Sequence, residues 1–393
     1  MQQHPARTAF TWEERGAQSS AKWLSASERP APKHVVLVDD RLTADRAIGF
    51  ASQGTAMLWQ GDFQGAKQIL SAIGRRLTKQ SARAGKRGAA PATAAEQFYR
   101  IRQTRAQRSR VQSLILIPLE LQCGVVSIPL PRAPEVDAAI RFAYGELALG
   151  EQDRAVVSLQ ELVGVLSAHQ WYVNGVDVPS LGAKIHPHYG TFMPTRHEYV
   201  DLVATAPLPA HDLAFDIGTG TGVLSAVLAK RGIGRVIGTD VQQRAVHCAT
   251  ENFERLGIEE VAEARMCDMF PDGRSSLIVC NPPWLPGSAA TSLDAAIYDP
   301  GSQMLLSFLA GLPNHLSEGG EGWLVISDLA ELLGLRTREM LLDAIARAGL
   351  EVIDRLDTTP AHGRASDATD VLHAARSREV TSLWRLRVAA TAA

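Results

Sequence analysis

Cysteines, long apolar runs and net charge are all scarce in this sequence of 393 residues. Its four cysteines, Cys123, Cys248, Cys267 and Cys280, form no C-x-x-C pair, which argues against a disulfide framework or a zinc module and fits a reducing cytoplasm. The most apolar stretch, residues 114–130, is broken by prolines and polar residues, so we expect buried strands there and no membrane span. The first residues lack the apolar core of a signal peptide.

Positive charge is concentrated in one segment. The whole chain has 40 Lys and Arg residues against 42 Asp and Glu residues, a net charge of -2 that indicates no particular class of partner. Residues 75–110, however, contain one acid, Glu96, and eleven basic residues: Arg75, Arg76, Lys79, Arg83, Lys86, Arg87, Arg100, Arg102, Arg105, Arg108 and Arg110. This segment is either a solvated insertion or a phosphate-binding surface, because dense positive charge attracts polyanions by releasing their counterions.

The chain length and the order of predicted elements indicate two domains. A typical domain has about 100–200 residues, so we expect a disordered tail over residues 1–33, an α/β domain over residues 34–172 and a second domain over residues 173–393. Alternating strands and helices in the smaller first domain favour parallel pairing. We predict strands at residues 34–40, 55–59, 114–117 and 125–128, helices at 65–77, 95–111, 133–149 and 152–166, and a mobile loop at 81–95.

A glycine-rich turn in the second domain predicts a ligand site. An apolar strand that starts at Leu213 ends in the acid Asp216, the turn Gly218-x-Gly220-x-Gly222 follows, and an apolar helix runs on to about Lys230. Glycines let a backbone approach a ligand closely, and the start of a helix offers unpaired N–H groups. Asp216 stands two positions before the first glycine, where its carboxylate would oppose a pyrophosphate but suits a ligand with an ammonium group.

Two further acids follow predicted strands. The strand at residues 235–240 ends in Asp240, 24 residues after Asp216, where a carboxylate can accept both hydroxyls of a ribose. A third stretch ends at Asp268 and Met269, a polar and an apolar side chain that could read and flank an adenine ring. The three acids in this order predict a nucleoside site, although any one of them alone would more often be a surface acid or a helix cap.

The fourth strand of the second domain, residues 276–280, runs into Asn281-Pro282-Pro283-Trp284. Two prolines fix the backbone and remove two donors, which leaves carbonyl acceptors in a rigid loop. A conjugated amine is a poor nucleophile, because its lone pair is delocalised. The Asn281 side-chain oxygen and the Pro282 carbonyl could accept the amino hydrogens, while Trp284 stacks on the flat substrate, a contact worth about 1–3 kcal/mol for a base.

The motifs DIGTGTG, VIGTD and NPPW together resemble those of the class I methyltransferases that modify amino nitrogens, over residues 189–388. Trp284 departs from the commoner Tyr or Phe. The resemblance implies a Rossmann-like α/β fold with a seven-stranded, mostly parallel sheet, and S-adenosylmethionine (SAM) as cofactor. It assigns cofactor binding to Asp216, Gly218, Thr219, Gly220, Thr221, Gly222, Asp240, Val241, Asp268, Met269 and Asn281. We predict further strands at residues 321–328, 351–357 and 381–388, the last antiparallel, a helix at 337–348, and a loop at 358–379 that could reach over the site.

Two more resemblances bear on the substrate. Residues 189–202 are similar to the segment before the cofactor loop in release-factor glutamine methyltransferases, with a Pro-Arg-x-x-x-Glu stretch that differs here by one residue, so Thr195 and Arg196 are candidate substrate-binding residues. The two-domain layout resembles that of ribosomal RNA guanine-N2 methyltransferases. With the basic segment, it makes a base in RNA or a ribosomal subunit the leading substrate, contacted by Arg100, Arg102 and Arg105.

Other substrates and roles stay open. A protein glutamine is the second candidate and a small-molecule amine the third, while a catalytically silent SAM-binding module is disfavoured by the intact NPPW loop. His186, His188 and His197 complete no metal-ligand set of known spacing, so we expect no metal.

Overall fold

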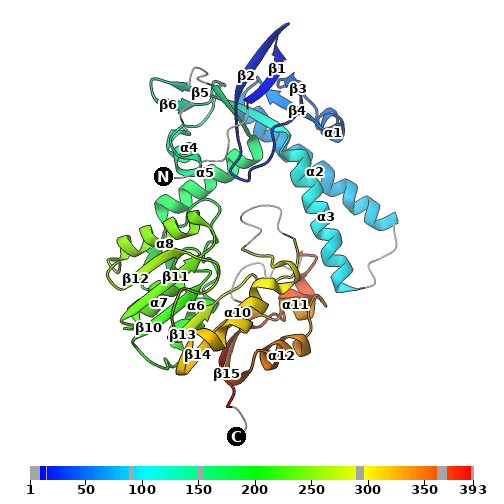
Figure 1. Cartoon of the computed structure of the whole chain (residues 1–393). Coiled ribbons are helices and arrows are strands. Elements are labelled where there is room, and N and C mark those ends of the chain that lie inside the picture. Colours follow the sequence, from blue (N-terminus) through cyan, green and yellow to red (C-terminus); the bar gives the residue numbers. More distant parts are fainter. Residues whose placement is uncertain are drawn as a thin grey trace. The chain divides into compact units, whose positions relative to one another are not determined.

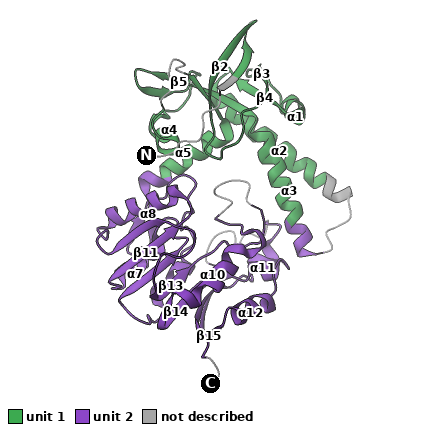
Figure 2. Ribbon diagram, viewed as in Figure 1, with its two compact units in different colours: residues 1–92, 99–170 green, residues 93–98, 171–393 purple. Residues whose placement is uncertain are grey.

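The computed structural model describes residues 9–14, 16–87, 93–147, 154–288, 296–360 and 370–390. The chain divides into two compact units, coloured separately in Figure 2. Unit 1 comprises residues 1–92 and 99–170, and unit 2 comprises residues 93–98 and 171–393. The division near residue 170 lies close to the domain boundary that the sequence predicts at 172.

Unit 1 is built on a mixed sheet (Figure 1). Its strand order is β1-β2-β7-β5-β4-β3, and β6 pairs with β5. Parallel pairs join β3 to β4, β4 to β5 and β2 to β7, which agrees with the predicted α/β style. The strands are β1 (Ala9–Glu14), β2 (Ala17–Leu24), β3 (His34–Val38), β4 (Thr55–Trp59), β5 (Ile115–Gln122), β6 (Val125–Ser127) and β7 (Arg154–Ser158).

The prediction of a disordered tail over residues 1–33 is wrong for the hairpin formed by β1 and β2. Strand β2 pairs with β7 inside the main sheet. Its Ala21 and Trp23 are buried, as is Trp12 of β1, in a cluster with Leu58 and other apolar residues of the neighbouring strands. Burial of such large aromatic side chains stabilises the hairpin despite the polar composition around it.

The helices of unit 1 correct two more predictions. Residues 81–87, expected in a mobile loop, continue α2, and residues 88–92 of that loop lie outside the described part of the chain. Residues 154–158, expected to be helical, form the buried strand β7, because Ala155-Val156-Val157 pairs with β5 in the sheet interior. The helices are α1 (Ala44–Ser52), α2 (Phe63–Arg87), α3 (Ala94–Gln112), α4 (Asp137–Tyr144) and α5 (Leu159–Asn174).

Unit 2 contains a second seven-stranded sheet with the order β12-β11-β10-β13-β14-β16-β15. Strands β10 to β14 pair in parallel, and β16 is antiparallel to both of its neighbours. This is the predicted Rossmann-like sheet with an antiparallel last strand. Its strands are β10 (Leu213–Ile217), β11 (Arg235–Asp240), β12 (Ala262–Met266), β13 (Ser275–Cys280), β14 (Leu316–Ser327), β15 (Leu350–Thr358) and β16 (Thr381–Val388), and β8 (Val176–Val178) and β9 (Ala183–Ile185) form a separate hairpin.

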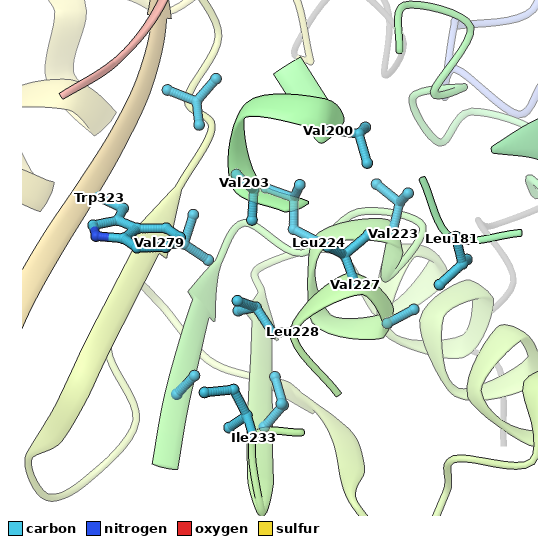
Figure 3. Close-up of a cluster of buried hydrophobic side chains, with 14 of the residues drawn as sticks. Leu181, Val200, Val203, Val223, Leu224, Val227, Leu228, Ile233, Val279 and Trp323 are labelled. Carbon is cyan, nitrogen blue, oxygen red and sulfur yellow. The ribbon is translucent and has the colours of Figure 1, made fainter. Parts of the chain in front are cut away.

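Helices cover both faces of this sheet, because alternate strand residues point to opposite sides. Ala214 of β10 joins one buried cluster, which includes α6, α7 and α8, and the next residue, Phe215, joins the other, which includes α10 and α12. Figure 3 shows the first cluster, where Val200 and Val203 of α6 lie near Leu224 of α7. The helices are α6 (Glu198–Thr205), α7 (Val223–Lys230), α8 (Gln243–Leu256), α10 (Gln303–His315), α11 (Leu329–Leu332), α12 (Arg338–Arg347) and α14 (His373–Arg376), with a 3-10 turn, η1 (Pro300–Ser302).

No helix in the described ranges is both long enough and apolar enough to cross a membrane.

Candidate active site

Three strands of unit 2 bring the predicted site residues together. Ile217 of β10 is in register with Thr239 of β11 on one side and with Cys280 of β13 on the other. The next residues, Gly218 after β10, Asp240 at the end of β11 and Asn281 after β13, therefore lie at the same edge of the sheet. In open α/β sheets this edge, at the carboxyl ends of the strands, is where ligands bind.

The glycine-rich turn has the backbone that its sequence predicts. Gly218, Gly220 and Gly222 all have positive φ angles, of 73°, 57° and 80°. A side chain at Gly222 would meet Phe253 of α8 at 2.6 Å, whereas one at Gly220 would meet no atom closer than 3.9 Å. The first contact shows a turn packed against α8, and the second shows open space beside Gly220 that a ligand can enter.

Asp216 is almost completely buried below this turn. Its Oδ2 atom accepts hydrogen bonds from the Thr219 hydroxyl at 2.7 Å, the Ser225 hydroxyl at 2.7 Å and the Ser225 amide at 3.1 Å. Burial raises the pKa of this carboxyl above its ordinary range, and the hydrogen bonds oppose that rise. Asp216 thus holds the turn against α7, while its contact with a ligand ammonium group stays a prediction.

Asp240 links the turn to the second strand end. Its Oδ2 accepts a hydrogen bond from the Gly220 amide at 3.2 Å, and its Oδ1 accepts one from the Gln242 amide at 2.9 Å. A carboxylate has about four acceptor positions, so both oxygens can accept a further hydroxyl. Neither Asp216 nor Asp240 has an ion-pair partner in the described ranges. Two unneutralised carboxylates in one place suit a ligand with a positive charge and hydroxyl groups, as SAM has.

The predicted adenine contacts lie next to Asp240. Val241 is 61% exposed directly after β11 and so is accessible to a ligand at this edge of the sheet. The Cys267 amide donates to the Asp240 carbonyl at 3.1 Å, and the Thr239 hydroxyl donates to the Met269 carbonyl at 2.5 Å. These bonds hold the exposed Asp268 and the half-buried Met269 beside the second strand end. A flat ring between Val241 and Met269 stays a prediction that this placement supports.

The Asn-Pro-Pro-Trp loop begins directly after β13. The Trp284 indole N–H donates a hydrogen bond to Asn281 Oδ1 at 2.8 Å, and the ring of Tyr199 meets the indole edge-on, with 6.5 Å between ring centroids. Tyr199 is buried, and its pKa is raised by burial and by the nearby charge of Asp216. The same aromatic residue therefore lies close to both the NPPW loop and the acid of the cofactor turn.

Arg196 is placed differently from the prediction that it binds substrate. Its guanidinium carbon lies 4.6 Å from the centroid of the Trp284 ring, and its donors bond to protein acceptors: Nε to Glu198 at 2.6 Å, Nη1 to Glu379 at 3.0 Å and Nη2 to Thr381 at 3.3 Å. Thr195 is exposed at the preceding position. Sequence reasoning missed Tyr199, Glu379 and Thr381, since nothing in their spacing connects them to the NPPW loop.

The other predicted substrate contacts belong to unit 1. Arg100 and Arg105 are exposed on α3, and Arg102 is half-buried.

In the described ranges no group of three or more His, Cys, Asp or Glu residues could hold a metal ion. His188 Nε2 lies 2.5 Å from Glu251 Oε2 on α8, and His186 Nδ1 lies 2.6 Å from the Tyr172 carbonyl. His188 therefore links the segment after β9 to α8, and His186 links the same segment to α5.

Comparison with known sequences finds methyltransferases that are similar to the part of the chain that contains this site. Residues 201–332 match the methyltransferase small domain family. A tRNA1(Val) (adenine(37)-N6)-methyltransferase of Shewanella woodyi is 30% identical over 113 residues, 26% of this chain and 46% of the relative. A release factor glutamine methyltransferase of Geobacter sulfurreducens is 26% identical over 237 residues, 57% of this chain and 75% of the relative. This chain thus spans less than half the length of the first relative and three quarters of the second.

A solved structure of a ribosomal protein L11 methylase from Lactobacillus delbrueckii subsp. bulgaricus is 20% identical, with a TM-score of 0.33, over 49% of this chain and 80% of that one. The family match at residues 201–332 covers the glycine turn, Asp240 and the NPPW loop described above. Residues 201–332 therefore belong to the methyltransferase small domain family, and the unit that contains them is a class I, S-adenosylmethionine-dependent methyltransferase domain.

Proposed function

We propose that this protein transfers the methyl group of SAM to a planar amino nitrogen of a base in RNA, most directly ribosomal RNA. One observation carries the proposal. Strands β10 and β13 pair so that Ile217 is in register with Cys280, and Asn281 comes directly after Cys280, next to the cofactor turn. An amino group held by Asn281 and Pro282 would lie beside a methyl donor held by the glycine turn and Asp240.

The chemistry requires positioning more than proton transfer. Bound SAM supplies an electrophilic methyl group on a positively charged sulfur. Asn281 Oδ1 and the Pro282 carbonyl accept the amino hydrogens, which draws the nitrogen lone pair out of conjugation and toward the methyl carbon. With SAM held by the glycine turn and Asp240, the N–C bond would form as the S–C bond breaks, and the surplus proton on nitrogen would then leave to water. Alignment and exclusion of water provide the rate, so a general base is unnecessary.

The basic helices of unit 1 support an RNA substrate. The exposed cationic residues are Arg75, Arg76, Lys79 and Arg83 on α2 and Arg100, Arg105, Arg108 and Arg110 on α3. Glu96 is the one acid in α3, and α2 has none over its described bounds. Arg76, Lys79 and Arg83 also line a pocket beside α2, together with Gln80. Cations on successive turns of a helix suit a phosphate backbone.

A protein glutamine is the second candidate, since its planar amide fits the same Asn-Pro acceptors and relatives such as that of G. sulfurreducens methylate release factors. The tRNA adenine enzyme of S. woodyi shows that relatives of this domain also act on RNA. We favour RNA because the basic surface has no evident use in a glutamine methyltransferase.

In the deciding experiment, the purified protein is incubated with methyl-labelled SAM and one candidate substrate. The candidates are ribosomal RNA, transfer RNA, intact ribosomal subunits and total protein. We expect label in an RNA fraction, at an exocyclic amino nitrogen identified by nucleoside mass spectrometry. Label confined to a release factor would replace the RNA proposal by the glutamine one.

Two variants separate the roles within the site. Asn281→Ala should remove turnover but change the dissociation constant of SAM by less than about twofold, because the Asn281 amide binds the substrate amino group. Asp240→Ala should weaken SAM binding by about tenfold or more, because hydrogen bonds to a charged group contribute about 1.5–3 kcal/mol. Label transfer measures turnover, and isothermal titration measures the affinity for SAM. Normal turnover in Asn281→Ala would remove this residue from the mechanism.

A further inference from the structure

The guanidinium carbon of Arg196 lies over the Trp284 ring, 4.6 Å from its centroid, and two buried acids bond to the guanidinium nitrogens. Its three bonded nitrogens point to Glu198, Glu379 and Thr381 in the plane of the guanidinium, which leaves the flat face for the indole ring. Such a cation–π contact contributes on the order of 0.5–2 kcal/mol. A lysine could not reproduce it, because its ammonium group has neither the flat face nor the fork of donors.

The acids that hold Arg196 are themselves buried. Glu379 is 1% exposed, and its Oε1 also accepts a hydrogen bond from the Ser327 hydroxyl at 2.6 Å. Glu198 is 7% exposed at the start of α6. Ser327 ends β14 and Thr381 begins β16, so the guanidinium is tied to three separate elements of unit 2.

Trp284 in turn decides which way the Asn281 amide faces. The oxygen and nitrogen ends of an amide have nearly the same shape, but only the oxygen can accept the indole N–H. The bond at 2.8 Å therefore fixes Oδ1 toward Trp284 and turns Nδ2 away. With its second acceptor position, Oδ1 can still take an amino hydrogen. In the flipped amide, Nδ2 would instead present hydrogens to the hydrogens of the substrate amine.

We propose that Arg196 is a positioning residue, which clamps Trp284 so that the indole N–H locks Asn281 in the orientation that accepts the substrate amino group. The proposal rests on the proposed function in one respect, the role of Asn281 as the acceptor of that group. It gives the tryptophan of this loop a role that phenylalanine could not perform, because phenylalanine has a stacking face but no N–H.

The first test needs no substrate. In a 15N-labelled protein, the indole N–H resonance of Trp284 is identified by its loss in Trp284→Phe. We expect this resonance to move in Asn281→Ala and in Arg196→Lys, and to stay in place in Arg385→Lys. Arg385 is a matched control, since it is also partly buried and bonded to two acids, Glu321 and Asp354, but lies on β16 and makes no described contact with the NPPW loop. An unmoved resonance in Arg196→Lys would overturn the clamp.

The second test measures catalysis. Trp284→Phe and Arg196→Lys should each lower kcat for methyl transfer by about tenfold or more, with KM for the acceptor and the dissociation constant of SAM changed much less, because a misplaced catalytic group costs rate before affinity. The double variant should lose no more than the worse single variant, since both act through Asn281. Additive losses, or an equal loss in Arg385→Lys, would show a merely structural role. If Asn281→Ala keeps full turnover, the proposed role of Asn281 as the acceptor of the amino hydrogens fails, and the resonance test still shows whether Arg196 holds Trp284 in place.

Discussion

At the scale of single residues, the hydrogen bonding of Asp216 and its negative charge can be separated by a substitution. Only one of its two oxygens accepts the hydrogen bonds that hold the turn, and no described residue bonds to the other. Asparagine can therefore keep the bonding oxygen in place while losing the charge. The carboxylate is costly to bury, since desolvation is the largest influence on its pKa.

We therefore expect Asp216→Asn to fold with a free energy of unfolding close to that of the native protein near neutral pH. Loss of the buried charge is favourable, whereas the buried Nδ2 hydrogens, which have no described acceptor, cost about 1–3 kcal/mol. The pKa of Asp216 is raised in the folded state, so the stability it contributes is complete below its unfolded pKa and is lost as the pH rises through the folded pKa. The variant should lack this decline, which urea unfolding over a pH series measures. If the carboxylate also meets the ammonium group of SAM, the dissociation constant will rise by about tenfold or more. Unchanged affinity would restrict Asp216 to a structural role.

At the scale of elements, the sequence predicts best where a pattern is local. The predictions for the strands at 55–59, 235–240 and 381–388 match β4, β11 and β16 residue for residue, because a short apolar run bounded by turn residues is a sufficient signal. The prediction of helix at β7 is wrong, since Arg154–Ser158 continues directly into α5 without a turn residue between them. Only its pairing with β2 and β5, both far away in sequence, makes it a strand.

The predictions for the site residues also succeed where the pattern is local and fail where it is not. The glycines, Asp240 and Asn281 follow their strands in the chain, so their proximity could be inferred from strand order alone. Glu379 reaches Arg196 from 183 positions away, and the direction of the Trp284 N–H depends on a side-chain rotamer. Contacts of that kind require the packed structure.

Helix α3 is the element that best tests the RNA proposal. Reversing two of its exposed charges, in Arg100→Glu with Arg105→Glu, should weaken binding of ribosomal RNA at low salt and reduce the steepness of the salt dependence. Removal of one cation that neutralises a phosphate lowers the slope of log K against log salt by about one, so the slope should fall by about two. Filter binding between low and physiological salt measures it.

The control for this prediction has the same change in net charge at another place. Arg347→Glu with Arg387→Glu alters two exposed arginines on α12 and β16 of unit 2. Their effect on the slope should be small if α3 itself contacts the phosphates. Equal effects of the two pairs would mean that total charge, not this helix, determines RNA affinity.

At the scale of the whole molecule, each described buried cluster belongs to a single unit. The cluster around Trp12 and Trp23 contains only residues of unit 1, and the two clusters on the faces of the second sheet contain only residues of unit 2. A chain with separate cores need not unfold in one step. All the predicted cofactor residues lie in unit 2, so SAM can stabilise that unit directly and unit 1 only through whatever coupling exists between them.

We therefore expect two unfolding transitions in differential scanning calorimetry, and we expect SAM to raise the temperature of one of them, that of unit 2. At a hundred times its dissociation constant, a ligand that binds only the folded state adds about 2.7 kcal/mol, which for a domain of this size corresponds to about 5–10 °C. At the same SAM concentration, a tenfold weaker affinity in Asp240→Ala should reduce the added stability to about 1.4 kcal/mol and so roughly halve the shift. Neither transition should disappear, because the substitution changes the ribose contact and leaves both cores intact. An RNA ligand on α2 and α3 should move the other transition. If SAM instead raises both transition temperatures equally, the two units unfold together. The assignment of cofactor binding and RNA binding to two independent cores would then be wrong.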